Sequence, residues 1–191
     1  MTSTTSGHTA LTLPFDPLTP LDPNSRPTVE AIRRLRKELY ENAASVESSY
    51  GGGEFGLLGM LMPSADYNTG APGTPFIMPD TKPPIPNLSG PGAEERKQQY
   101  ELDVADYNRA LQFQSQIKKM MLVAIPRLYI EDLSDKVMQF TMVTPKEILT
   151  HLMTTYGKIR DQDLDQNLEN ITRPWDPDTN IKLVFSNGKL C

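Results

Sequence analysis

The chain has 191 residues, 38% of them hydrophobic, and a formal net charge of −5 at pH 7. This length and apolar content suffice for one modest core or two small lobes. The acidic balance argues against a free-standing nucleic-acid binder, which is expected to be basic overall, although a local basic patch stays open. The single cysteine, Cys191, excludes an internal disulfide and any zinc site built from several cysteines.

Residues 1–26 are rich in Thr, Ser and Pro, and the first ten lack the basic start and apolar core of a signal peptide. No apolar run reaches the length of a membrane span. We therefore expect a cytoplasmic protein without a membrane partner. Proline recurs at every third position, which favours extended chain without a core, so the segment is predicted to be a disordered tail. These prolines are Pro14, Pro17, Pro20 and Pro23.

Residues 27–50 are predicted to form a helix, because apolar side chains recur at steps of three and four until Gly51. The opposite face carries four basic residues that could contact RNA phosphates. Three acidic residues share this surface and favour a solvated face with ion pairs instead. The basic residues are Arg33, Arg34, Arg36 and Lys37, and the acidic ones are Glu30, Glu38 and Glu41.

Residues 54–92 form a Pro/Gly-rich region in which no long regular element is expected. Its apolar run, residues 55–62, fits either a buried helical turn or a short strand. Two P-x-x-P spacings, Pro72/Pro75 and Pro83/Pro86, could dock on an SH3-type groove. A linker or wrapping loop is the more typical interpretation of this composition.

Residues 93–173 are predicted to be a helical core. The longest helix runs from about residue 93 to residue 125, with acids in its first turn and Pro126 after its end. Its paired methionines, Met120 and Met121, fit either an adaptable binding surface or core packing. A shorter helix is expected to carry Ile130, Leu133 and Val137, and another is expected near residues 161–171.

The clearest local signal is a T-x-x-E capping box at Thr144 and Glu147, with Pro145 at the first helical position. Val143 and Ile148 fall where a hydrophobic staple is expected. These residues predict a helix that begins at residue 145 and ends before a glycine, residue 157.

Motifs for bond chemistry fail on their context. Residues 51–56 match G-x-G-x-x-G but follow a predicted helix, whereas the dinucleotide fingerprint follows a strand. The acids that begin at Asp161 lack the glycine and glutamate of a calcium loop. His151 has no histidine or cysteine companion, and a catalytic role would need two converging polar groups in a deep pocket. We therefore predict no catalytic residue, metal, cofactor or small-molecule substrate.

An ordered series of segments resembles the N-terminal, capsid-forming part of Gag polyproteins from copia-type LTR retrotransposons. The series reads "ELYENAASV", "GGGEFGLLGMLM", "YELDVADYNRALQFQSQIKKMM", "VTPKEILTHLMTTYGKI" and "DLDQNLENITRPWDPDT". The fourth segment carries the family's capped-helix pattern. The residues that match this pattern are Thr144, Glu147, Ile148, Leu152 and Tyr156.

The resemblance implies a mainly α fold: a capsid-like bundle of about five helices over residues 27–185 with a Pro/Gly-rich insertion. It also implies a non-enzymatic structural protein that self-associates into particles and packages element RNA. The chain has no zinc knuckle, so RNA contact would be weak, and residues 186–191 are expected to be a truncated C-terminus. Candidate self-association residues, which the sequence does not divide between core and interface, are Leu35, Leu39, Phe113, Met120 and Met121.

Two further hypotheses remain open. The first is a monomeric protein- or peptide-binding helical module, a host-adopted or degenerate Gag relic, with residues 72–91 as its active feature. The second is a poorly folding fragment, which loose packing around Trp175 and residues 181–185 would favour.

Overall fold

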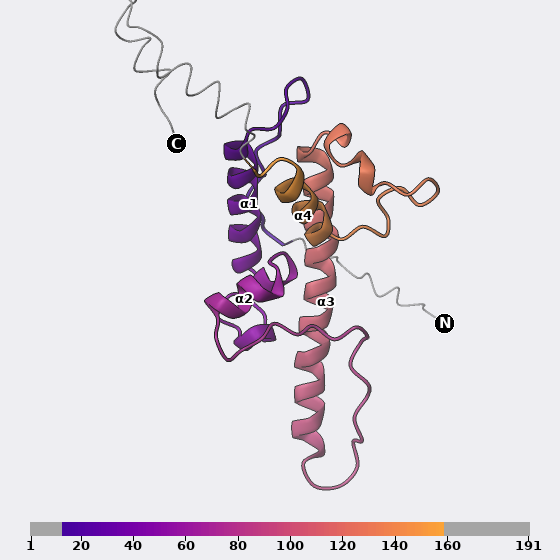
Figure 1. Ribbon diagram of the computed structural model, residues 1–191. Coiled ribbons are helices and arrows are strands. Elements are labelled where there is room, and N and C mark those ends of the chain that lie inside the picture. The colour runs from indigo at the N-terminus through magenta and orange to yellow at the C-terminus, as the bar shows by residue number, and fades with distance from the viewer. Residues whose placement is uncertain (1–12, 159–191) are drawn as a thin grey trace, which may run out of the picture.

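The structure is a computed structural model, and it describes residues 13–158. This part is mainly helical, as predicted, with four α-helices (Figure 1): α1 (Val29–Ala44), α2 (Ser64–Gly70), α3 (Ala93–Ala124) and α4 (Pro145–Thr155). α4 packs against both α1 and α3, and α2 lies at the lower end of α1. The helix expected near residues 161–171 lies outside the described residues.

α1 is shorter than the predicted span of 27–50. Its N-cap is Thr28, whose hydroxyl accepts a hydrogen bond from the Ala31 N–H at 3.1 Å. After Ala44 the chain folds back over the helix end, where the Leu57 N–H donates to the Ala43 carbonyl at 3.0 Å. The face that repeats at three and four residues is buried, as its period predicted. Its fully buried members are Ile32, Leu35, Leu39 and Ala43.

The Pro/Gly-rich region contains more structure than expected. Its apolar run makes a 3₁₀ turn, Leu58–Met60, rather than a strand, and buries Leu57 and Leu61. The helix α2 follows inside what was predicted to be a loop. Its Tyr67 is 2% exposed and packs edge-on against Phe76 at 5.7 Å between ring centroids, which ties residue 76 back to α2.

α3 begins and ends within one residue of its predicted bounds. All its buried side chains lie at or beyond Ala110, so its first half projects past the core (Figure 1). The irregular segment before α3 runs beside this half. Arg96 fastens the two together, because its guanidinium donates to the carbonyl oxygens of Asn87, Ser89 and Pro91 at 2.8–2.9 Å.

The shorter helix expected around Ile130 does not form. Residues 127–133 make two 3₁₀ turns, Arg127–Tyr129 and Glu131–Leu133. The Asp135 carboxylate then accepts from the N–H groups of Val137 and Met138 at 2.8 Å. Such side-chain-to-backbone bonds compete with a helix, and Val137 is left 85% exposed in the resulting turn.

α4 confirms the predicted capping box. The Glu147 N–H donates to the Thr144 hydroxyl at 3.2 Å, and the Thr144 N–H donates to the Glu147 carboxylate at 2.7 Å. Pro145 occupies the first turn, and the helix ends at Thr155, two residues before Gly157. Together, residues 148, 149 and 152 bury the face of α4 that meets the core.

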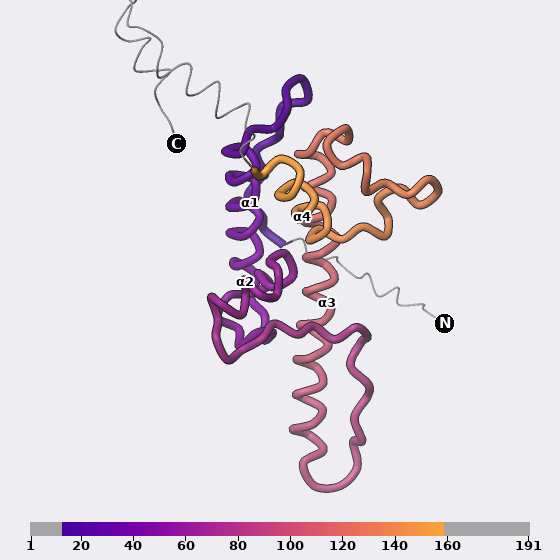
Figure 2. Tube along the Cα trace, viewed as in Figure 1, coloured from indigo at the N-terminus to yellow at the C-terminus, as the bar shows by residue number. Residues whose placement is uncertain are grey.

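The expected disordered tail over residues 1–26 is wrong for residues 13–26, and residues 1–12 lie outside the described part. Figure 2 shows that this segment runs alongside α1 and then reverses direction in a loop before α1 begins. It is ordered by contacts distant in sequence. Leu18 and Leu21 are 8% and 4% exposed, and the Leu21 N–H donates to the Ala124 carbonyl at 2.9 Å.

Candidate functional site

The self-association candidates lie in the intramolecular core, with one exception. Four of them are 0% exposed and pack in a single cluster with residues of α4 and of the N-terminal segment. Met120 is half-buried against the same cluster. The sequence left the division between core and interface open, and in the folded chain the four fully buried side chains belong to the core. The four core residues are Leu35, Leu39, Phe113 and Met121.

Apolar side chains are exposed elsewhere, notably on the projecting half of α3 and on the segment beside it. Leu102 is 63% exposed on α3, and Ile77 and Ile85 are 70% and 77% exposed on the adjacent segment. We call residues 93–109 of α3 the arm. Tyr100 and Val104 follow the helical repeat of apolar residues, and Leu102 does not. This break in the repeat is the one feature of the sequence that predicts an exposed Leu102.

The arm presents a polar pair on either side of Leu102. Glu95 and Arg109 lie seven residues before and after it, so all three occupy one face of the helix. Arg109 also fixes the base of the arm, because its guanidinium donates to the Asp106 carboxylate and to the Glu47 carbonyl, both at 2.9 Å. The other Asp106 oxygen accepts from the Ser49 N–H at 2.9 Å. The arm is therefore held rigidly where it leaves the body.

The basic face of α1 is solvent-accessible but partly paired. Arg33, Arg34 and Lys37 are exposed, whereas Arg36 is half-buried with its guanidinium 6.0 Å from the Tyr40 ring centroid. Lys37 lies 3.7 Å from the Glu41 carboxylate. These interactions support the interpretation of a solvated face with local pairing.

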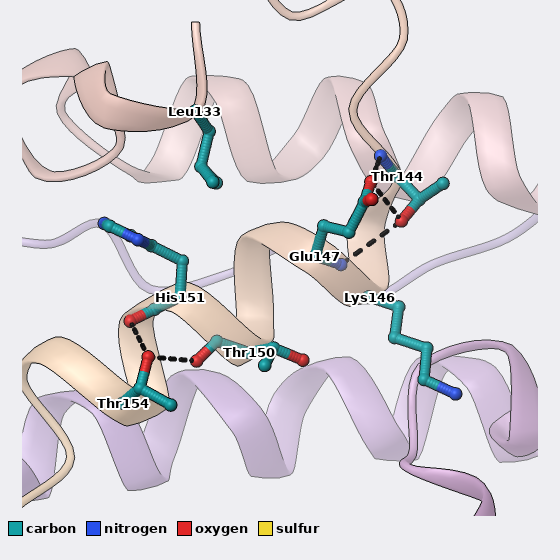
Figure 3. Close-up of a pocket in the computed structure, with 7 residues that line it drawn as sticks. All are labelled: Leu133, Thr144, Lys146, Glu147, Thr150, His151 and Thr154. Atoms are coloured by element: carbon teal, nitrogen blue, oxygen red, sulfur yellow. Dashed lines mark hydrogen bonds between the residues drawn. The ribbon is translucent and has the colours of Figure 1, made fainter.

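An open hollow of about 540 Å³ lies along α4 (Figure 3). Its polar groups do not converge. Glu147 turns back to Thr144, the His151 ring points away from Glu147, and Lys146 extends in another direction. The lining residues are Leu133, Thr144, Lys146, Glu147, Thr150, His151 and Thr154.

Two titratable groups of this hollow, Glu147 and His151, are each committed to a structural bond. The N–H and hydroxyl of Thr144 lower the pKa of Glu147, and the charge of Lys118 lowers it further. The His151 Nε2 lies 3.1 Å from the Tyr129 carbonyl oxygen, so a proton on this nitrogen is donated to the backbone. Glu147 thus forms part of the helix cap, and His151 contacts the backbone of the turn that ends at Tyr129.

Comparisons with known protein families, curated proteins and solved structures find no match to this chain. Among the side chains of residues 13–158, no cluster of three or more His, Cys, Asp or Glu could hold a metal ion. Likewise, none of the helices in this described part is long and apolar enough to span a membrane.

Proposed function

We propose that this chain is a non-enzymatic structural protein of the retrotransposon Gag type, which self-associates as a component of a capsid or virus-like particle. The segment order described above supports the family, and its capped-helix pattern is realised in α4. The observation that carries self-association is the arm. It places Leu102 in solvent at 63% exposure on a helix half in which no residue is fully buried.

An exposed helix half of this kind becomes more stable when a partner packs against its apolar face. Roughly half of a 32-residue helix spans about 25 Å, and most helical stability in proteins comes from packing an apolar face. Two arms that pair antiparallel about a two-fold axis at Leu102 bring the two leucines together. The same symmetry places Glu95 near Arg109 of the second copy, because each lies seven residues from the axis.

The expected interaction is weak in a single pair. Burying one leucine contributes about 1.5–3 kcal/mol, which two copies supply twice before the entropy of association is subtracted. Particles are built from many such interactions, and avidity then stabilises the assembly without any tight pairwise interface. We therefore expect concentration-dependent association rather than a permanent dimer.

Light scattering of the full chain across a range of concentrations tests this proposal. The mass should rise with concentration for the natural chain, and Leu102→Glu should hold it near the monomer. Val137→Glu is the matched control, because Val137 is 85% exposed in a turn away from the arm and should leave the rise unchanged. A folded monomer at every concentration, or equal loss with both variants, would contradict association through the arm.

A second candidate function, the monomeric peptide-binding module, is favoured by a different observation. Residues 13–21 lie without regular secondary structure between α1 and α3, and side chains of both helices hold their main chain. This resembles the way a helical protein holds an extended peptide. A strict monomer that binds such a peptide in trans would favour this function over assembly.

A further inference from the structure

The N-terminal segment repeats every three residues, and each position of the repeat has one role. Residues 13–23 read L-P-F-D-P-L-T-P-L-D-P, in which proline, an apolar residue and a third residue alternate. A repeat of three is the repeat of a polyproline II helix, which exposes its backbone groups for bonding because it has no internal hydrogen bonds. The segment is thus patterned like a proline-rich ligand.

The apolar position of the repeat enters the core. Phe15 packs edge-on against Phe113 of α3, with ring centroids 5.8 Å apart. Leu18 and Leu21 follow at steps of three and are both buried. By contrast, the prolines at positions 14, 17 and 20 are exposed.

The third position of the repeat donates its backbone N–H to a polar side chain. The Leu13 N–H donates to Gln116 of α3 at 3.2 Å, and the Asp16 N–H donates to Asn42 of α1 at 2.8 Å. The same helix α1 supplies Glu38, which accepts from the Thr19 N–H at 2.8 Å.

Two of these three side chains, Asn42 and Glu38, make a second hydrogen bond to the same residue of the segment. Asn42 also donates to the Asp16 carbonyl at 2.9 Å, and Glu38 also accepts from the Thr19 hydroxyl at 2.6 Å. Side chains of α1 and α3 thus hold the main chain of residues 13–21 at a fixed three-residue spacing, as a binding site holds an extended peptide. We call the place where the two helices hold this segment the groove.

We propose that this groove is a docking site for residues 13–21 of a second copy of the chain, which exchanges with the chain's own segment. A second copy supplies the same ligand with the same contacts, so exchange costs little beyond opening the connection between the segment and α1. The inference rests on the proposed self-association and adds a second interface between copies, distant from the arm.

The connection that must open is a short surface turn. The Asp22 carboxylate accepts from the Asn24 N–H and from the Ser25 hydroxyl, both at 2.8 Å. The body of the protein holds this connection at two points. The Tyr129 hydroxyl lies 2.6 Å from the carbonyl oxygens of Asp22 and Ser25, and the Arg26 guanidinium donates to the Thr155 carbonyl at 3.0 Å. Shortening the turn prevents the segment from folding back and favours exchange between copies.

The first experiment uses the full chain carrying Leu102→Glu, so that pairing through the arm does not contribute. Deleting Asn24 and Ser25 in this background should convert the monomer to a species of twice the chain mass by light scattering. Adding Leu18→Asp to the deletion should abolish that species. A folded monomer after the deletion would overturn the exchange, whereas failure of the arm proposal alone would leave this result intact.

The second experiment uses the fluorescein-labelled peptide of residues 13–22 and decides the question even where the deletion disturbs folding. A protease site replaces Asn24 and Ser25, and the full chain is cleaved there. The peptide should bind the cleaved chain one-to-one, at least tenfold more tightly than the uncleaved chain, where the resident segment competes. No binding, or equal binding of a peptide carrying Leu18→Asp, would overturn the docking site.

Discussion

Asn42 and Asp16 exchange two hydrogen bonds across 26 residues of sequence. The Asn42 side chain accepts from the Asp16 N–H at 2.8 Å and donates to the Asp16 carbonyl at 2.9 Å. Asn42 is 4% exposed, and apart from tyrosines no other polar or charged residue of the described part is buried. One amide thus satisfies both backbone groups of a residue that no secondary structure pairs.

Asn42→Ala should destabilise the chain by about 1–3 kcal/mol, because it removes both bonds and leaves the Asp16 backbone groups unpaired. Urea unfolding followed by circular dichroism measures this change. Asn108→Ala is the control: Asn108 is exposed on α3 and should change stability by no more than about 0.5 kcal/mol. Equal effects of the two substitutions would show that the two hydrogen bonds between Asn42 and Asp16 do not order the N-terminal segment.

Alanine should lower the stability of the chain when it replaces Leu39 and lower its self-association when it replaces Leu102. Leu39 is 0% exposed, so Leu39→Ala should cost about 2–5 kcal/mol of stability through reduced burial and a cavity. Leu102 is 63% exposed, so Leu102→Ala should leave the unfolding midpoint nearly unchanged and reduce only the growth of mass with concentration. Thermal unfolding and light scattering on both variants separate core from interface. A stable Leu39→Ala variant that no longer associates would restore Leu39 as an interface residue.

The capping box should make the chain lose stability in acid. The Glu147 pKa lies below its ordinary value of 4.5, chiefly through the Thr144 N–H, so the folded state favours the carboxylate. Its contribution, about 0.5–1 kcal/mol at this exposed helix N-terminus, is present above pH 4.5 and is lost as pH falls through the folded-state pKa. Gln at this position preserves the motif without the charge.

Urea unfolding of the natural chain and of Glu147→Gln between pH 7 and pH 3 measures this contribution. The difference between them should be largest near neutrality and should shrink in acid. The pKa values of Asp22 and Asp135 are also lowered, mainly by backbone N–H groups, and their effects cancel because both proteins contain them. A difference that does not vary with pH would exclude the charge as its source.

Gly56 should tolerate no side chain. Its φ is +53°, and a Cβ there would approach the carbonyl oxygens of Ala43, Ala44 and Val46 within 2.4–2.9 Å. Gly56→Ala should therefore cost about 2–5 kcal/mol through left-handed backbone strain and overpacking. Gly70→Ala, with open space around it, should be nearly neutral in the same thermal unfolding measurement. A neutral Gly56→Ala would mean that the chain does not fold back on the end of α1.

RNA binding, where it occurs, should depend on the exposed basic residues of α1. Arg33→Ala with Arg34→Ala should weaken binding of a single-stranded RNA and reduce the slope of log K against log salt by roughly 0.7 for each phosphate that the protein no longer neutralises. Fluorescence anisotropy at several salt concentrations measures the slope. Lys82→Ala, on the proline-rich segment, removes one exposed positive charge away from α1 and is the control. An unchanged slope in the double variant would assign any binding to another surface.

Several elements followed from local sequence alone. The Thr144 and Glu147 pair formed the predicted capping box because both partners lie within one helical turn. The long helix kept its predicted bounds because Pro126 cannot continue it and the span before it contains no proline. The buried face of α1 was likewise readable from its period.

The tertiary structure alone decided which apolar residues are core and which are surface. Leu39, Leu102 and Phe113 are all large apolar residues in the sequence, and only the packing of the elements around the core makes Leu39 and Phe113 inaccessible. The order of residues 13–26 was decided in the same way. Their composition predicts disorder, but the burial of Leu18 and Leu21 in the core, together with bonds from the sequence-distant Asn42 and Gln116, opposes the entropy of ordering them. Local patterns fix elements because the bonds that form them are local, whereas burial depends on partners that the chain brings together only when it folds.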